Sequence, residues 1–242
     1  MITIQGNQLM KRKPYYETPL GKLYHGDCLE IMPQLEPVDL VLTDPPYRII
    51  SGQGGGLRNK RDWMKKVTAA GLDTFEPKRF MKRLKNPHAY IFCSKDLLDE
   101  YIHIFKEQDL QWEILIYAKK NPIPTKGNKY LPDKEYCFFI RGGGNCYFNN
   151  NEKYEKYYTV KLISVTTNKY HPTEKDPQFI QDRVLISTKE GSLVLDPFLG
   201  SGTTAMICER LKRRWIGIEI EEKYCEIAAK RIEQERKQLK LF

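Results

Sequence analysis

The sequence lacks the features that would place this protein in a membrane or an oxidising compartment. No apolar run approaches the roughly 20 residues that a membrane-spanning helix needs. Residues 1–16 do not contain the continuous apolar core of a signal peptide. The six cysteines are scattered without a C-x-x-C pair, which favours buried free thiols over a zinc site. We therefore expect a cytoplasmic protein with no metal centre.

The 242 residues fit one α/β domain. Short apolar runs typical of buried strands alternate with segments of helical spacing along most of the chain. The predicted strands span 22–27, 38–43, 88–94, 112–118, 135–141, 192–196 and 215–220, and the predicted helices span 28–35, 75–84, 95–108, 177–189, 203–213 and 221–239. This alternation predicts a doubly wound, mostly parallel, Rossmann-like sheet.

Positive charge is concentrated in two segments that interrupt the alternation. Residues 48–66 carry a net charge of +5 and residues 119–170 carry +6, so the rest of the chain sums to −2. Residues 119–170 also contain ten aromatic side chains. A solvated face would explain charge alone, but basic residues interleaved with rings favour a nucleic acid partner. We interpret 119–170 as an inserted region around a β-hairpin, between halves at 20–118 and 171–242.

A glycine-rich turn, DPFLGSGTT (196–204), lies between a predicted strand and a helix. Gly200 and Gly202 allow close approach of the backbone to a ligand, and Glu219 follows Gly202 by 17 residues at the end of the next strand. No lysine follows the second glycine as in a phosphate-binding Walker loop, and Asp196 favours a cationic or hydroxylic group. Asp27, after another strand, is either a helix N-cap or an acceptor for an adenine amino group.

The stretch TDPPY (43–47) ends a buried strand with an acid, two prolines and an aromatic ring. Asp44 and the Pro45 carbonyl can accept both N–H groups of an aromatic amine, Pro46 stiffens the loop, and Tyr47 can stack on a base. These two hydrogen bonds would orient a poorly nucleophilic amine for attack on a methyl donor. A proline-rich turn is the simpler interpretation of this loop alone. However, the glycine turn also follows a strand, and carboxyl ends of parallel strands share one edge.

In the order of these motifs the chain resembles DNA amino-methyltransferases that use S-adenosylmethionine. Among them it resembles the permuted β group, in which D-P-P-Y precedes F-x-G-x-G. The resemblance covers about 20–118 and 168–236. Its anchors are GDCLEIM (26–32), TDPPY (43–47), HPTEK (171–175), DPFLGSGTT (196–204) and IGIEI (216–220). It departs at Asp176, which separates Lys175 from the proline that usually follows.

This resemblance implies the fold, S-adenosylmethionine as cofactor, and a catalytic loop of Asp44, Pro45, Pro46 and Tyr47. The implied cofactor-site residues are Asp27, His171, Thr173, Lys175, Asp196, Phe198, Gly200, Gly202, Thr203 and Glu219. Within the family, the H-P-T-x-K element lies beside the methionine end of the cofactor. His171 on its own would more often be structural.

The leading hypothesis is therefore a methyltransferase acting on adenine N6 in double-stranded DNA, with the target base flipped into the Asp44 loop. Aspartate at position 44 favours adenine, whereas serine there more often accompanies cytosine-N4 methylation, the nearest rival. Protein glutamine methylation and a non-catalytic nucleic-acid-binding fold are weaker alternatives. We expect 119–170 to contact bases and 48–66 to clamp phosphates. The sequence leaves open the recognition site, a homodimer and a companion restriction endonuclease.

Overall fold

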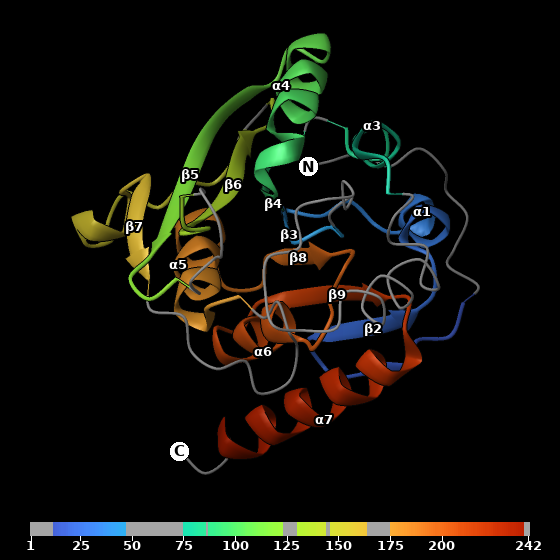
Figure 1. Ribbon diagram of the computed structural model, residues 1–242. Coiled ribbons are helices and arrows are strands. Elements are labelled where there is room, and N and C mark those ends of the chain that lie inside the picture. The colour runs from blue at the N-terminus through green and yellow to red at the C-terminus, as the bar shows by residue number, and fades with distance from the viewer. Residues whose placement is uncertain are drawn as a thin grey trace.

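The computed structural model describes residues 12–46, 75–85, 87–122, 130–143, 146–163 and 175–239. These residues contain one nine-stranded sheet in the order β1-β2-β9-β8-β3-β4-β6-β5-β7 (Figure 1). The strands are β1 (Tyr16–Glu17), β2 (Gly21–His25), β3 (Leu40–Thr43), β4 (Ala89–Cys93), β5 (Gln111–Lys119), β6 (Lys134–Arg141), β7 (Val160–Ile163), β8 (Leu193–Asp196) and β9 (Arg214–Glu219). The helices are α1 (Cys28–Ile31), α3 (Pro77–Met81), α4 (Leu98–Glu107), α5 (Pro177–Ser187), α6 (Thr203–Arg210) and α7 (Glu222–Leu239), with short 3-10 helices η1 (Met32–Gln34), η3 (Lys95–Leu97) and η4 (Tyr154–Lys156).

The centre of the sheet is parallel. Strands β2, β9, β8, β3 and β4 pair in parallel with one another. Leu40 and Leu42 of β3 pack into one apolar layer, and Val41 packs into the layer on the opposite face. Burial on both faces explains why these strands are almost continuously apolar rather than alternating. The prediction of a doubly wound, mostly parallel α/β sheet is confirmed.

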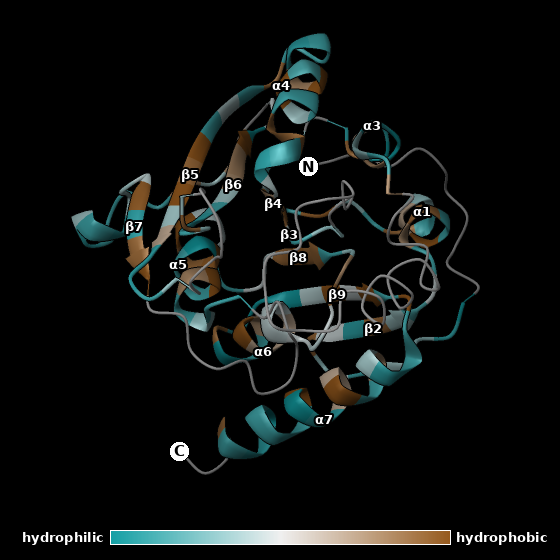
Figure 2. Ribbon diagram, in the orientation of Figure 1, coloured by the Kyte–Doolittle hydropathy of each residue, from teal (hydrophilic) through white to brown (hydrophobic). Residues whose placement is uncertain are grey.

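Helices cover both faces of this sheet. Phe80 of α3 and Phe105 of α4 pack into the layer that also contains α1, whereas Ile180 of α5 and Ile232 of α7 pack into the opposite layer with α6. Figure 2 shows β8 largely hydrophobic and α7 largely hydrophilic. With both faces covered, the ends of the strands are the place where a ligand can reach the sheet. None of the described helices has the length and apolar character needed to cross a membrane.

Part of the predicted insertion belongs to the sheet itself. Residues 134–141 form β6, which lies between β4 and β5 and pairs antiparallel with both. Cys137 and Phe138 of this strand are fully buried. This strand of the predicted inserted region 119–170 therefore joins the central sheet, where its apolar side chains complete the core. Strand β7, which the sequence did not predict, pairs parallel with β5 at the sheet edge. The recognition role of the region stays a prediction.

The six cysteines are free, as predicted, and five of them are buried. Cys146 is the exception, with intermediate exposure. Burial raises the pKa of Cys28 and of Cys93 to about 12. These two thiols are therefore neutral at physiological pH and unreactive as nucleophiles.

Candidate active site at the carboxyl edge of the sheet

Four acidic side chains lie at the carboxyl ends of four adjacent parallel strands. In sheet order they are Asp44 just after β3, Asp196 at the end of β8, Glu219 at the end of β9, and Asp27 shortly after β2. The parallel registers of these strands bring the four ends to one edge (Figure 1). The two loops carrying TDPPY and DPFLGSGTT therefore share that edge, as the sequence predicted.

Asp196 joins the two loops through hydrogen bonds. The Thr43 hydroxyl, one residue before Asp44, donates to Asp196 Oδ1 at 2.9 Å. The Thr204 hydroxyl donates to Oδ2 at 2.7 Å, and the Phe198 backbone N–H donates to Oδ1 at 3.1 Å. With both oxygens used inside the protein and only 6% of the residue exposed, Asp196 is better placed to hold the two loops together than to bind a cofactor directly.

The buried position of Asp196 leads to a pH-dependent prediction. Burial raises the pKa of this carboxyl to about 6, partly offset by the hydrogen bonds from Thr204 and Thr43. The folded protein thus binds this proton more tightly than the unfolded chain, in which the pKa of an aspartate is about 4. The contribution of protonated Asp196 to the free energy of unfolding is therefore complete below about pH 4 and is lost as the pH rises through about 6.

Asparagine at position 196 can keep the same three hydrogen bonds, because the Thr204 hydroxyl can accept as well as donate. We expect the stability of D196N relative to wild type to increase between about pH 4 and 6 and then level off. Urea unfolding across that range measures the difference. A difference that does not change with pH would contradict the raised pKa.

The glycine turn is fixed by close contact with α7. Gly202, the N-cap of α6, has φ +88°, and a Cβ added there would lie 2.9 Å from the Ala228 Cβ. Arg231 of α7 donates to the Ser201 carbonyl at 2.8 Å and to the Ser201 hydroxyl at 2.6 Å. Gly200 also has a positive φ, +54°, but an added Cβ would meet nothing within 4 Å. The turn is therefore packed tightly behind Gly202 and open at Gly200.

This difference predicts unequal effects of two alanine substitutions. Gly200→Ala should lower the free energy of unfolding by about 1–2 kcal/mol, the penalty for a left-handed backbone at a residue with a Cβ. Gly202→Ala should lower it by about 2–4 kcal/mol, because the clash with Ala228 adds to that penalty. Chemical denaturation of both variants measures these changes. Equal losses would show that contact with α7 does not restrict the turn.

Glu219 holds the glycine turn from the neighbouring strand. Its Oε2 accepts the Gly200 backbone N–H and its Oε1 accepts the Glu221 backbone N–H, both at 2.8 Å. Burial raises the pKa of Glu219, although these two hydrogen bonds act in the opposite direction. Each carboxylate oxygen has a second lone pair, so this side chain can still accept hydroxyl groups from a ligand.

Asp27 is the N-cap of α1, which was one of its two predicted interpretations. Its Oδ1 accepts the Leu29 backbone N–H at 2.8 Å. The Gly26 backbone N–H donates to the Glu219 carbonyl at 2.9 Å, so the ends of β2 and β9 are joined directly. Capping by one oxygen is compatible with the second predicted role as an acceptor for an adenine amino group.

The other predicted cofactor residues of this turn lie at the same edge. The Phe198 ring packs against those of Phe75 and Phe80, with centroids 5.5 and 5.6 Å away. Thr203 is buried as the first residue of α6. These positions give the turn an apolar wall and a helix N-terminus.

Lys175 lies beside Asp44, whereas the family resemblance put it at the methionine end of the cofactor. Its Nζ is 2.7 Å from Asp44 Oδ2 and 3.8 Å from Glu135 Oε2. The ammonium also lies 4.9 Å from the centroid of the Phe92 ring. Only 10% of the Lys175 side chain and 21% of the Asp44 side chain are exposed.

Several predicted residues lie outside the described part of the chain. These are Tyr47, His171, Thr173 and the basic segment 48–66. Their assigned roles stay predictions.

Three residues that support this edge have a weak signal or none in the sequence. Thr43 precedes the motif acid directly, and a hydroxyl at the last position of a buried strand was the available signal. Glu135 is an acid in the otherwise apolar stretch EYCFFI, which marks it as unusual for a buried strand. Arg231 gave no signal, because a basic residue in a charged terminal helix is ordinary.

A row of acids at the carboxyl edge of a parallel sheet, beside a glycine turn, defines a nucleotide-type binding site in a Rossmann-like enzyme. Residues 38–230 match the N6_N4_Mtase family, described as DNA methylase. The chain therefore belongs to this family, and it is a DNA methyltransferase.

Curated relatives extend over nearly the whole chain. Type II methyltransferase M2.DpnII of Streptococcus pneumoniae is 32% identical, covering 94% of this chain and 95% of its own. Type II methyltransferase M2.LlaDCHI of Lactococcus lactis subsp. cremoris is 30% identical, covering 93% of each chain. The crystal structure of the M1.HpyAVI–SAM complex superimposes with a TM-score of 0.64 at 27% identity, covering 88% of this chain and 98% of that one. The cytosine-N4-specific PvuII methyltransferase, with a TM-score of 0.69 at 19% identity, shares the fold.

Proposed function

We propose that this enzyme methylates the N6 amino group of adenine in double-stranded DNA, with S-adenosylmethionine as the methyl donor. The observation that carries the proposal is the hydrogen bond between Thr43 and Asp196. It fixes the Asp44 loop directly against the glycine turn, so an amine held at one loop lies beside a ligand held at the other.

The chemistry of the edge suits S-adenosylmethionine. This cofactor presents hydrogen-bond donors, namely ribose hydroxyls, an adenine amino group and an ammonium group. The side chains of Asp27 and Glu219 present acceptors on adjacent strands. The space at Gly200 lets a ligand approach the backbone. When bound, S-adenosylmethionine supplies a methyl group activated by its sulfonium charge.

We assign the cofactor-site residues as follows. Glu219 binds the ribose hydroxyls, Asp27 binds the adenine amine, and Phe198 provides an apolar contact. The backbone of the turn, including Gly200, Gly202 and Thr203, shapes the site, and we place His171 and Thr173 near the methionine end. Asp196 acts indirectly by holding the two loops together.

The Asp44 loop would bind the target amine. The lone pair of an adenine amino nitrogen is delocalised into the ring, so it is a weak nucleophile. Two acceptors, the Asp44 carboxylate and the Pro45 carbonyl, would draw the N–H groups out of the ring plane and localise that lone pair. Pro45 and Pro46 fix the backbone that carries these acceptors, and Tyr47 would stack on the flipped base.

Product analysis tests the choice of base. Unmethylated DNA incubated with the enzyme and S-adenosylmethionine is digested to nucleosides and separated by mass spectrometry. N6-methyladenine is the expected product, because position 44 is aspartate. N4-methylcytosine would overturn the choice of base while retaining the enzyme class, and methylation of neither base would overturn the proposal.

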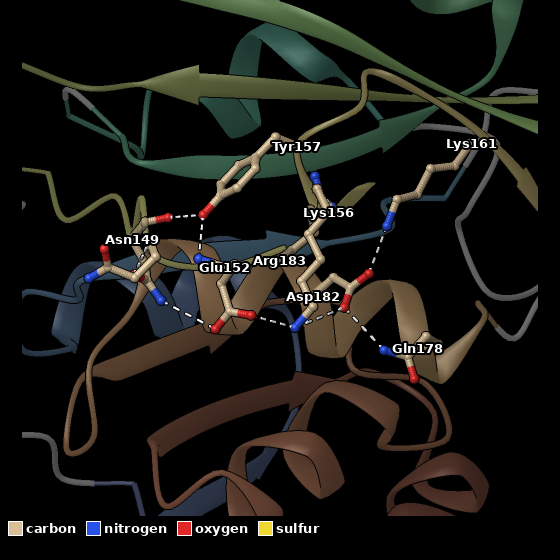
Figure 3. A network of polar contacts seen from close by, with 9 residues as sticks. Asn149, Glu152, Lys156, Tyr157, Lys161, Gln178, Asp182 and Arg183 are labelled. Carbon is tan, nitrogen blue, oxygen red and sulfur yellow. Dashed lines mark hydrogen bonds and ion pairs between the residues drawn. The ribbon is translucent and has the colours of Figure 1, made fainter. Parts of the chain in front are cut away.

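Contacts to DNA would come from residues 119–170, with the basic segment 48–66 clamping phosphates. Figure 3 shows how the described part of this region is attached to α5. Asp182 accepts from Lys161 at 2.7 Å, and Lys156 bridges Asp182 at 3.8 Å and Glu152 at 2.6 Å. This network would hold a recognition surface next to the catalytic edge.

The cellular setting is also part of the proposal. A DNA substrate supports a cytoplasmic location for the enzyme. The Type II designation of the relatives supports a place in restriction-modification beside a companion endonuclease. A homodimer would allow this short chain to read a longer site.

A further inference from the structure

A chain of alternating charges extends from the Asp44 loop into the antiparallel half of the sheet. Lys175 Nζ lies 2.7 Å from Asp44 Oδ2 and 3.8 Å from Glu135 Oε2. Glu135 Oε1 lies 2.8 Å from Lys119 Nζ. No side chain of the four is more than 28% exposed. We call Asp44, Lys175, Glu135 and Lys119 the charge chain.

The members of the charge chain come from four separate segments. Asp44 follows β3, Lys175 precedes α5 by two residues, Glu135 lies in β6, and Lys119 ends β5. The charge chain is therefore formed by tertiary packing, and not by residues that are close in the sequence on one exposed face. A buried ammonium needs compensating carboxylates, and here Asp44 and Glu135 supply them from two different segments.

Lys175 remains charged in this environment. Burial opposes its charge, but the Asp44 and Glu135 carboxylates outweigh burial and raise the pKa of Lys175. At neutral pH the ammonium therefore donates hydrogen bonds and cannot accept a proton from a methylated amine. Its chemical contribution is to hold and orient its neighbours.

We propose that Lys175, supported by Glu135, is a positioning residue that holds the Asp44 carboxylate in the orientation needed to grip the target amine. The inference rests on the proposed function, in which Asp44 binds that amine. It differs from the role implied by the family resemblance, in which Lys175 belongs to the cofactor site. The 2.7 Å contact between Lys175 Nζ and Asp44 Oδ2 supports the positioning role.

Several titratable groups of the described residues surround the pair of Lys175 and Asp44. The described groups that interact electrostatically with Asp44 or Lys175 include Cys93 of β4, Tyr101 of α4, Cys137 of β6 and Asp196 of β8. Burial raises the pKa of the two thiols and of the phenol, so these three are neutral at physiological pH. These three groups therefore do not duplicate the positive charge of Lys175.

The test compares K175M, K175R and E135Q with wild type. Two quantities are measured for each protein: the Kd for S-adenosylmethionine and the single-turnover methyl-transfer rate at saturating cofactor and DNA. For K175M we expect a rate at least about tenfold lower and a Kd within about twofold of wild type. K175R should recover part of the rate because it keeps the charge, and E135Q should lose a smaller part.

The separation of rate from cofactor affinity provides a readout that general loosening of the fold would not reproduce. Loosening would raise the Kd for S-adenosylmethionine and lower the rate together, whereas loss of a positioning contact lowers the rate at saturation alone. Arg214→Gln is the matched control. It removes another 2.7 Å ion pair, to Glu36, from the opposite end of the parallel strands. Its rate and its Kd for S-adenosylmethionine should equal those of wild type.

Each alternative result has a definite meaning. A Kd raised about tenfold with an unchanged rate at saturation would make Lys175 a cofactor ligand and overturn the inference. An unchanged rate in K175M would also overturn it. If K175M does not fold, loss of rate in E135Q without loss of cofactor binding decides in favour, and no loss decides against. A wild-type protein that methylates no DNA base would overturn the proposed function together with this inference.

Discussion

Asp44→Ala is expected to abolish methyl transfer while leaving the binding of S-adenosylmethionine largely intact. The substitution removes the side-chain acceptor that would draw the target amine out of the plane of its ring. Removal of a preorganised group of this kind typically lowers a rate by about a hundredfold to ten-thousandfold. The glycine turn, Glu219 and Asp27 do not depend on the Asp44 side chain for their hydrogen bonds.

Single-turnover methylation of DNA and equilibrium binding of S-adenosylmethionine separate these two effects. Asp39→Asn is a suitable control, because Asp39 lies just before the same strand at its opposite end. Its Oδ2 accepts the Leu193 backbone N–H at 2.7 Å, and an amide oxygen can accept the same hydrogen bond. The control should methylate at nearly the wild-type rate. Turnover by Asp44→Ala similar to that of the control would refute the catalytic role.

The fold could be predicted because its signals are local. Burial on both faces makes a strand such as LVLT continuously apolar, and helical spacing marks segments such as α7. Strand β6 was predicted as a strand but not as part of the central sheet. Its partners β4 and β5 are specified by long-range packing of side chains such as Phe138, which no local pattern records. Strand β7 was missed because it has only four residues and follows a segment dominated by Lys, Asn and Tyr.

The candidate site could be predicted only at the level of its motifs. The chemistry of Asp44, Glu219 and the glycine turn follows from residue type and from position at strand ends. The hydrogen-bond partners do not, because Thr43 and Asp196 are 153 residues apart in the sequence. For the same reason Lys175 was assigned to the cofactor, whereas its contact with Asp44 required the three-dimensional structure. Long-range contacts thus changed the proposed roles of two motif residues.

Not all lysines of region 119–170 should contribute equally to DNA binding. Lys120 and Lys153 are exposed, whereas Lys156 and Lys161 are only 23% and 22% exposed and bind the buried Asp182. Each phosphate contact that is lost reduces the slope of log affinity against log salt by about 0.9. The double variant K120A/K153A should therefore weaken DNA binding and reduce that slope by about 2. Titrations at several salt concentrations measure both changes.

Loss of Lys156 and Lys161 should affect stability rather than the salt slope. The double variant K156M/K161M leaves the Asp182 carboxylate with Gln178 as its side-chain donor among the contacts drawn in Figure 3. Breaking a buried ion pair from one side costs about 3–5 kcal/mol, so we expect a comparable fall in the free energy of unfolding. Lys230→Ala, an exposed residue of α7, controls for a general change in charge and should alter neither quantity. If K156M/K161M flattened the salt slope and K120A/K153A left it unchanged, the lysines around Asp182 would face the DNA, and the division between anchoring and binding lysines would be wrong.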